Sequence, residues 1–96
     1  MKTILTTNVF DDWFTHLRDR KAKRLIQVRI DRAEGDNFGD CKPVGEGVSE
    51  MRIDFGPGYR VYFTQKAFEI VILLAGGDKS GQEKDIRTAL QLAREL

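Results

Sequence analysis

The sequence predicts a single α+β domain in which an antiparallel-dominated sheet of four or five strands carries helices packed on one face. Three observations support this fold class. Three segments repeat apolar residues at helical spacing, two alternating runs flank Gly56-Pro57-Gly58, and Phe68–Ala75 is almost continuously apolar. In chain order the elements read β-α-α-β-β-β-β-α, an order typical of α+β domains.

Size and composition fit one compact domain over residues 1–96. The chain is 41% hydrophobic and 32% charged, which is ordinary for a globular protein, and its net charge of +1 does not by itself indicate a nucleic-acid binder. One cysteine, Cys41, allows no internal disulfide. The first residues, MKTILTT, lack an apolar run of the length expected for a signal peptide. The longest apolar run, Ile70–Ala75, is far shorter than the roughly 20 residues that span a bilayer. We therefore expect a cytoplasmic protein that contacts no membrane.

The first 17 residues predict a strand followed by a helix. Lys2–Thr7 is rich in Thr and Ile, and Asn8 is a good residue to cap the helix that follows. The apolar stripe of this helix predicts core packing for Trp13, whereas His16 lies off the stripe and is expected on the surface. The stripe consists of Phe10, Trp13, Phe14 and Leu17.

A second helix is predicted from Asp19 or Arg20 to Glu34, with Gly35 ending it. Its outer face is strongly basic, and two interpretations remain open. The face is either solvated and stabilised by pairs such as Gln27–Asp31, or it contacts phosphates or an acidic partner. Between residues 18 and 32 the net charge is +5, from two acidic residues and seven basic ones: Arg18, Arg20, Lys21, Lys23, Arg24, Arg29 and Arg32.

A glycine-rich loop, residues 35–47, follows the second helix and contains a short strand at Lys42–Val44. Because Pro43 has no amide hydrogen, we expect this strand at an edge of the sheet. The Gly45-Glu46-Gly47 sequence lacks the spacing and the Lys-Ser/Thr ending of a phosphate-binding P-loop.

The segment from Glu50 to Phe63 predicts a β-hairpin whose turn is Gly56-Pro57-Gly58. With Phe55 opposite Tyr59, one face carries only apolar side chains. On the other face, Asp54 pairs with Arg60 and Arg52 with Tyr62, so that two guanidinium groups and a phenol point away from the core. The apolar pairs are Ile53 with Val61 and Met51 with Phe63.

The last third of the chain predicts a central strand and a final helix. Phe68–Ala75 is apolar enough to be covered on both faces, and Gly76–Lys79 is expected to end this strand after a turn at residues 65–67. Ser80 and Glu83 have the spacing of a capping box. The helix that follows has an inward stripe of Ile86, Ala89, Leu90 and Ala93.

The residues that converge in this arrangement are cationic. No Ser-His-Asp, Cys-His or metal-ligand pattern is present, but Arg52, Arg60 and Tyr62 share the open hairpin face, with Lys79 and Lys42 on neighbouring strands. Such a group suits a phosphodiester, because arginines stabilise charge that develops on phosphorus and Lys79 or Tyr62 can exchange a proton. The alternative is that Asp54–Arg60 is only a structural cross-strand ion pair.

Two later segments and the start of the chain resemble a known family, so that the resemblance covers nearly the whole chain. GDCKPVGEGVSEMRIDFGPGYRVYF (39–63) and FEIVILLAGGDKSGQEKDIRTALQLA (68–93) are similar to RelE/HigB-type toxins, in particular the phage-derived addiction module killer proteins of the RelE/ParE superfamily. The most specific parts are GPGYRVYF and LLAGGDK. The resemblance implies a RelE/ParE-like fold and a toxin that enters the ribosomal A site and cleaves mRNA. The 2′-hydroxyl attacks the adjacent phosphate there, without a metal or cofactor.

The resemblance also implies roles for individual residues. Arg60 would stabilise the phosphate, Arg52 would be a second basic group, and Lys79 would protonate the leaving oxygen. Two positions depart from the family: Glu50 and Asp85 stand where RelE has a lysine and a tyrosine. Tyr62 is a candidate to replace that phenol, and the general base stays open. Residues expected to contact RNA are Lys42, Arg24 and Lys21.

Partners follow from the resemblance as well. We expect a helix-turn-helix antitoxin of the HigA type, together with the ribosome and mRNA. One alternative is a non-catalytic inhibitor of DNA gyrase, like the ParE relatives of this fold. A weaker one is a chain that serves chiefly as a repressor partner in a toxin–antitoxin operator complex.

Overall fold

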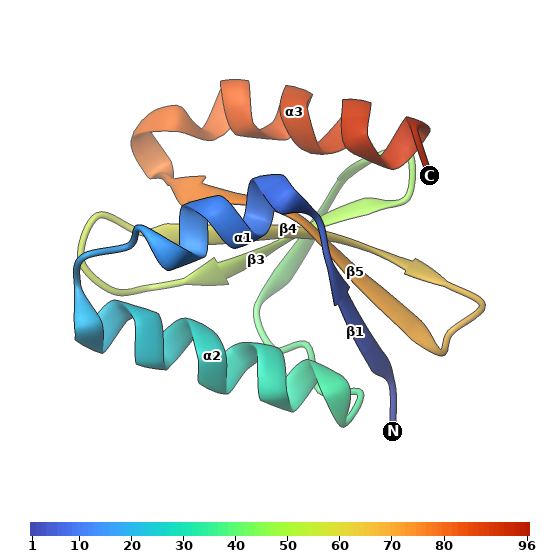
Figure 1. Cartoon of the computed structure of the whole chain (residues 1–96), viewed down its shortest axis with the longest axis horizontal. Helices are drawn as coiled ribbons and strands as arrows, with labels where there is room; N and C mark the ends of the chain where they lie inside the picture. Colours follow the sequence, from blue (N-terminus) through green and yellow to red (C-terminus); the bar gives the residue numbers. More distant parts are fainter.

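The computed structural model describes residues 1–96 and shows a five-stranded mixed sheet with helices on both of its faces (Figure 1). The predicted order of elements is confirmed, with one added 3₁₀ turn before the last helix. The elements are β1 (Thr3–Thr6), α1 (Asn8–Thr15), α2 (Arg20–Glu34), β2 (Cys41–Gly45), β3 (Val48–Ile53), β4 (Tyr59–Lys66), β5 (Ile70–Asp78), η1 (Lys79–Gly81) and α3 (Gln82–Arg94).

The strands follow the order β1-β5-β4-β3-β2 across the sheet. Strand β1 is parallel to β5, and the remaining neighbours are antiparallel. The sheet is therefore antiparallel-dominated, as predicted, and β2 with Pro43 lies at its edge.

The prediction that the helices pack on one face is wrong. Helices α1 and α2 cover one face and α3 covers the other. Figure 1 shows α2 and α3 on opposite sides of the sheet. The cause is the two-sided apolar character of the central strands. In β5, Val71 and Leu73 pack toward α1 and α2, whereas Ile72 and Leu74 pack toward α3. A strand with two apolar faces needs a cover on each.

Local signals set the limits of α1 and α2 closely. Thr7, rather than the predicted Asn8, caps α1 by accepting a hydrogen bond from the Phe10 amide at 3.1 Å. Helix α2 ends at Glu34 as expected, and Gln27 donates to Asp31 at 2.9 Å. The left-handed residue that follows is Asp36, with φ of 70°, and not Gly35.

The hairpin forms, but its predicted register is wrong by two residues. Ile53 pairs with Tyr59, Arg52 with Arg60 and Glu50 with Tyr62, so that residues 54–58 form a wider loop. Because a shift of two preserves which face each side chain occupies, the predicted apolar face survives. The predicted Asp54–Arg60 pair does not exist, since Asp54 lies in the loop.

The predicted end of the central strand at Gly76 is also wrong, because β5 continues to Asp78. Two glycines within it receive close neighbours from opposite faces. A Cβ atom on Gly76 would lie 2.2 Å from Cε3 of Trp13 in α1, and one on Gly77 would lie 1.9 Å from Oδ2 of Asp85 in α3. These glycines therefore allow Trp13 of α1 and Asp85 of α3 to pack closely against β5.

The start of α3 differs from the predicted capping box. Asp78 accepts a hydrogen bond from the Ser80 amide at 2.9 Å and caps η1, whereas Gly81 precedes α3 with no side-chain cap. The inward stripe is confirmed, since Ile86, Ala89 and Leu90 all contact the sheet. No helix in the structure combines the length and the apolar character needed to cross a bilayer.

Candidate functional site

A polar pocket of about 330 Å³ opens at the end of the sheet where the β3–β4 loop meets the end of β5. Its lining includes three of the four residues predicted to be catalytic, Arg52, Arg60 and Lys79. The structure thus brings the three predicted cations to one surface. The other lining residues are Asp40, Ile53, Asp54, Gly56, Pro57, Gly58 and Tyr59.

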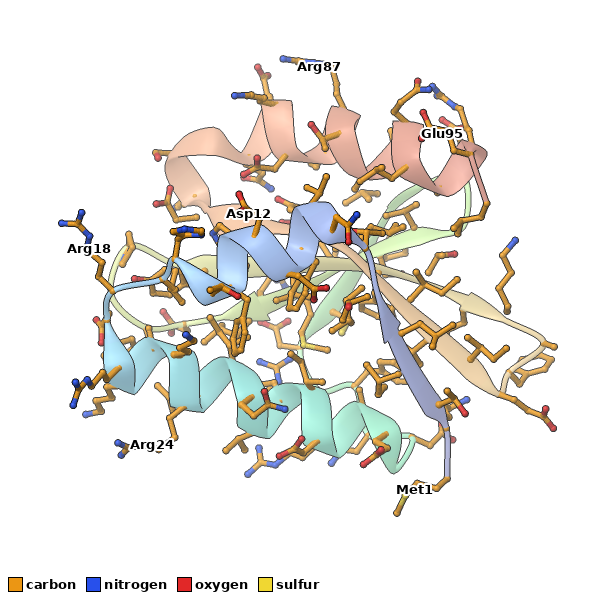
Figure 2. The ribbon with its side chains drawn as sticks, viewed as in Figure 1. Met1, Asp12, Arg18, Arg24, Arg87 and Glu95 are labelled. Carbon is orange, nitrogen blue, oxygen red and sulfur yellow. The ribbon has the colours of Figure 1, made fainter.

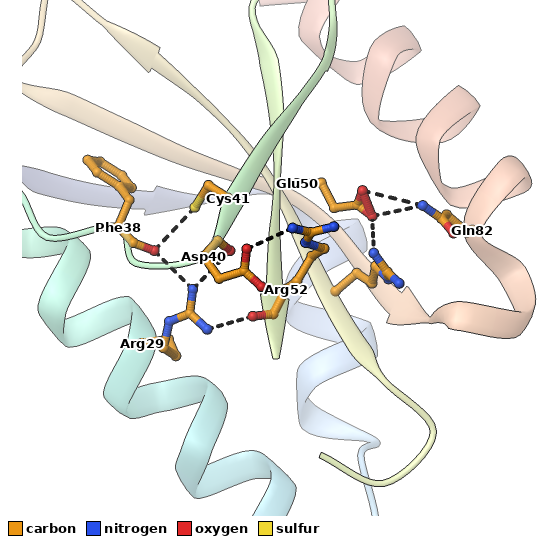
Figure 3. Close-up of polar contacts among 8 residues, drawn as sticks. Arg29, Phe38, Asp40, Cys41, Glu50, Arg52 and Gln82 are labelled. Carbon is orange, nitrogen blue, oxygen red and sulfur yellow. Dashed lines mark hydrogen bonds and ion pairs between the residues drawn. The ribbon is translucent and has the colours of Figure 1, made fainter. Parts of the chain in front are cut away.

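Arg52 is held by Asp40, a residue of the loop before β2. The Arg52 Nη2 atom lies 2.8 Å from Oδ1 of Asp40, and this hydrogen bond lowers the pKa of the Asp40 carboxyl group below its usual value. Arg29 of α2 supports the same region, as Figure 3 shows. It donates to the carbonyl oxygens of Arg52 at 2.6 Å, Phe38 at 3.0 Å and Asp40 at 3.2 Å.

The side chain of Arg60 is more buried than that of Arg52. Its side chain is 13% exposed, and its Nη1 atom lies 2.5 Å from Oε1 of Glu50, whose side chain is 2% exposed. Gln82, the first residue of α3, donates to both Glu50 oxygens at 2.9 and 3.3 Å (Figure 3). The Nε atoms of Arg52 and Arg60 are buried without a hydrogen-bond partner.

Lys79 and Asp54 are the pocket residues whose charges have no partner. Both side chains belong to exposed residues, and neither makes a hydrogen bond or ion pair within the chain. Lys79 follows β5 directly, and its Cβ lies beside Gly58 of the hairpin loop. With Arg52, Arg60 and Asp40, the lining thus holds three cations and two carboxylates, a small positive excess that suits an anion.

Tyr62 does not belong to the pocket, and the prediction of an exposed phenol is wrong. The residue is 0% exposed, because α3 covers the face of β4 that it occupies. Its hydroxyl group has no hydrogen-bond partner, and burial raises the pKa of the phenol well above its usual value. The tyrosine that lines the pocket is Tyr59, and burial is also the main reason why its pKa is raised.

The predicted RNA-contacting residues lie on two different elements, α2 and β2. Lys21 is exposed at the start of α2, and its Nζ lies 5.4 Å from the ring centre of Phe55 in the hairpin loop, next to the pocket. Arg24 points into solvent from the same helix (Figure 2), and Lys42 is exposed on the edge strand opposite Glu50. The basic residues of α2 therefore do not all belong to its outer surface, because Arg29 donates hydrogen bonds to carbonyl oxygens of the protein.

Sequence reasoning missed the carboxylates and the amide that hold the arginines: Asp40, Glu50 and Gln82. One signal for Glu50 was available. It lies two residues before Arg52 and therefore on the same strand face. Gln82 gave no signal, because its contact with Glu50 depends on α3 crossing the face that the sequence left uncovered. No group of three or more His, Cys, Asp or Glu residues is arranged to hold a metal ion.

Comparison with known proteins finds one informative relative. An uncharacterized protein of Haemophilus influenzae (strain Rd) is 52% identical over 93 residues, which cover 97% of this chain and 94% of that protein. The similarity therefore extends over nearly the whole domain. No protein-family model matches the chain.

Proposed function

From the premise that this chain belongs to the same family as the Haemophilus influenzae protein, we propose that it is the toxin of a type II toxin–antitoxin module, with a RelE/ParE-like fold. Its activity is ribosome-dependent cleavage of mRNA. The observation that carries the proposal is the meeting of Arg52, Arg60 and Lys79 in one pocket. The two motifs that resemble RelE/HigB toxins, GPGYRVYF and LLAGGDK, supply Arg60 and Lys79.

The pocket suits a transfer reaction within RNA. The 2′-oxygen forms a bond to the adjacent phosphorus, and the bond from phosphorus to the 5′-oxygen breaks. The products are a 2′,3′-cyclic phosphate and a 5′-hydroxyl group. Arg52 and Arg60 stabilise the charge on the non-bridging oxygens, and Lys79 gives a proton to the leaving 5′-oxygen. Asp54, a pocket carboxylate without a partner, accepts the proton of the 2′-hydroxyl group.

The same proposal assigns partners. Lys21 and Arg24 extend the basic surface from the pocket along α2 and contact the RNA backbone, and Lys42 contacts it from the edge strand. A helix-turn-helix antitoxin of the HigA type neutralises the protein in the cytoplasm. Tyr62 has no role in this scheme, because α3 buries it.

A second candidate function is non-catalytic inhibition of DNA gyrase. The observation that favours it is that Asp40 and Glu50 already bind Arg52 and Arg60, and that the Arg60 side chain is only 13% exposed. A surface that binds a protein target does not need a free guanidinium group.

Mapping of mRNA 5′ ends after expression tests the proposal. Codon-phased cuts are expected in the wild type. Lys79→Ala should reduce them about 10²- to 10⁴-fold, the usual cost of a lost general acid. Lys79 suits this test because it is exposed and its side chain makes no hydrogen bond or ion pair within the protein. Lys66→Ala, another exposed lysine at the far end of β4, is the matched control and should cleave normally.

Arg60→Ala is expected to abolish the cuts, although it also leaves Glu50 buried without its ion pair. Growth arrest with intact transcripts would contradict the nuclease. A loss of gyrase supercoiling activity in the presence of the purified protein would then support the second candidate.

A further inference from the structure

A buried polar cluster lies directly behind the pocket, between the sheet and α3. Its centre is Glu50, which is 1% exposed although its neighbours on this face are mainly apolar. It accepts one hydrogen bond from Arg60, at 2.5 Å, and two from the amide of Gln82. All three residues are thereby linked across two strands and a helix.

Stability alone does not account for this cluster. A buried ion pair gains little over apolar residues of the same volume, because both charges must leave water. Here the pair shares the face of the sheet under α3 with an apolar cluster that includes Val48, Tyr62 and Ala89. The Arg60 guanidinium group also carries a desolvation cost, because its Nε atom is buried without a hydrogen-bond partner. A polar group retained under such conditions calls for another reason.

The geometry points to that reason. Glu50 binds the guanidinium through Nη1 alone, so the contact is not the two-pronged pairing that would occupy a whole edge of Arg60. The Nη2 atom makes no hydrogen bond within the protein, and Arg60 lines the pocket. Gln82 in turn limits the rotation of the Glu50 carboxylate by binding both of its oxygens. A rigid donor group loses less entropy when it binds a phosphate.

We propose that Glu50 and Gln82 are positioning residues, which hold the Arg60 guanidinium at a fixed orientation toward a phosphate in the pocket. This inference rests on the proposed function. It makes the start of α3 part of the active site, although α3 supplies no group that touches the substrate. It also assigns a use to Glu50, a position at which the sequence departs from the family it resembles.

Two variants separate positioning from folding. Gln82→Ala removes the helix contact and leaves the Glu50–Arg60 ion pair intact, so it should fold. Glu50→Gln keeps an acceptor oxygen but removes the charge. The matched control is Arg94→Gln, which breaks the ion pair between Arg94 of α3 and Glu46 in the β2–β3 turn, far along the helix from the pocket. Thermal unfolding reports stability in each case.

The decisive measurement is the NMR signal of the Arg60 side-chain Nε–H group, assigned by its loss in Arg60→Lys. We expect this group to be as rigid as the backbone in the wild type and in Arg94→Gln, and clearly more mobile in Gln82→Ala. Titration with inorganic phosphate should shift the signal, with several-fold weaker binding in Gln82→Ala. Cleavage should fall about 10- to 100-fold in kcat with little change in KM, because a misplaced group loses contacts in the transition state.

These measurements can support or overturn the positioning role of Glu50 and Gln82. An Arg60 signal that is equally rigid and equally responsive to phosphate in Gln82→Ala and Glu50→Gln would overturn the inference. If the wild type cleaves no mRNA, the proposed function fails, but the mobility of Arg60 and its phosphate response still test the positioning. A loss of stability in Gln82→Ala without any change at Arg60 would show that the cluster serves folding only.

Discussion

At the scale of single residues, the pocket depends on partners that orient its charges. Asp40 binds Arg52 and Glu50 binds Arg60, whereas Asp54 and Lys79 stay free. The identity of the cations was predictable from the sequence, because Arg52 and Arg60 alternate with apolar residues on short strands. Their partners were not, since the wrong hairpin register paired Arg60 with Asp54.

The free carboxylate leads to a first prediction. Asp54→Asn should reduce mRNA cleavage by about 10²-fold or more, because an amide cannot accept the 2′-hydroxyl proton, and general bases typically contribute 10² to 10⁴. The protein should remain folded, since Asp54 is exposed and unpaired. The rate of 5′-end formation on ribosomes measures the effect. Asp31→Asn, on α2, is the control, and cleavage by Asp54→Asn at the wild-type rate would exclude this base.

A second prediction concerns Gly76. Gly76→Ala places a methyl group 2.2 Å from the Trp13 ring, so either α1 or β5 must shift. We expect a loss of about 1–3 kcal/mol in the free energy of unfolding, the usual cost of overpacking. Urea denaturation provides the measurement. Gly35→Ala serves as control, because its nearest neighbour would be an ordinary 3.5 Å contact with the Arg32 carbonyl oxygen. Equal stability of the two variants would contradict the packing account.

At the scale of elements, local signals placed helices and strands well but failed where two elements meet. The caps and apolar stripes of α1 and α2 follow from nearest neighbours along the chain, and the limits of α2 were correct. The predicted end of β5 was wrong. By local rules Gly76-Gly77 ends a strand, but in the structure these glycines lie within β5 and allow close contacts with Trp13 and Asp85. The predicted cap at Ser80 was also wrong, because Asp78 caps η1 by accepting a hydrogen bond from the Ser80 amide.

Arg29 provides the prediction at this scale. Its guanidinium group joins α2 to the loop before β2 and to β3 through three carbonyl oxygens. Arg29→Met should remove the guanidinium donor from all three oxygens, although the Arg52 amide still donates to Asp40 and the Cys41 thiol to Phe38. We expect a cost of about 1–3 kcal/mol of unfolding free energy. The Arg52 amide, which donates to the Asp40 carbonyl oxygen, should exchange its hydrogen faster. Arg24→Met, an exposed arginine of the same helix, should change neither quantity, and unaltered exchange in Arg29→Met would argue against this role.

At the scale of the whole molecule, the pKa values of Asp40 and Asp85 are shifted in opposite directions, so the two residues affect the pH dependence of stability with opposite sign. The Arg52 side chain lowers the pKa of Asp40, so this carboxylate stabilises the fold above its usual pKa of 3.8 and loses that effect as the pH falls. Burial raises the pKa of Asp85, which packs against Gly77. Its contribution therefore has the opposite sign: it is full below pH 3.8 and is lost as the pH rises.

The two aspartates thus give one paired prediction. At pH 7, Asp85→Asn should raise the unfolding free energy relative to the wild type, and Asp40→Asn should lower it. The difference for Asp85→Asn should shrink toward zero below pH 3.8, where this carboxyl group is protonated in both states. The difference for Asp40→Asn should begin to shrink there and disappear only as the pH falls through the lowered pKa of the folded state. Urea unfolding at pH 7 and pH 3.5 tests this. Shifts of the same sign in both variants at pH 7 would refute the assignment.

The sequence by itself determined the order and type of the strands and α-helices, the edge position of β2, the apolar face of the hairpin and the three cations of the pocket. These features depend on periodicity, caps and turn residues, which act between neighbours in the chain. Only the tertiary structure decided that α3 crosses the second face of the sheet. That crossing buries Tyr62 and brings Gln82 to Glu50, because two-sided apolar strands must be covered and the sequence does not say which helix covers which side.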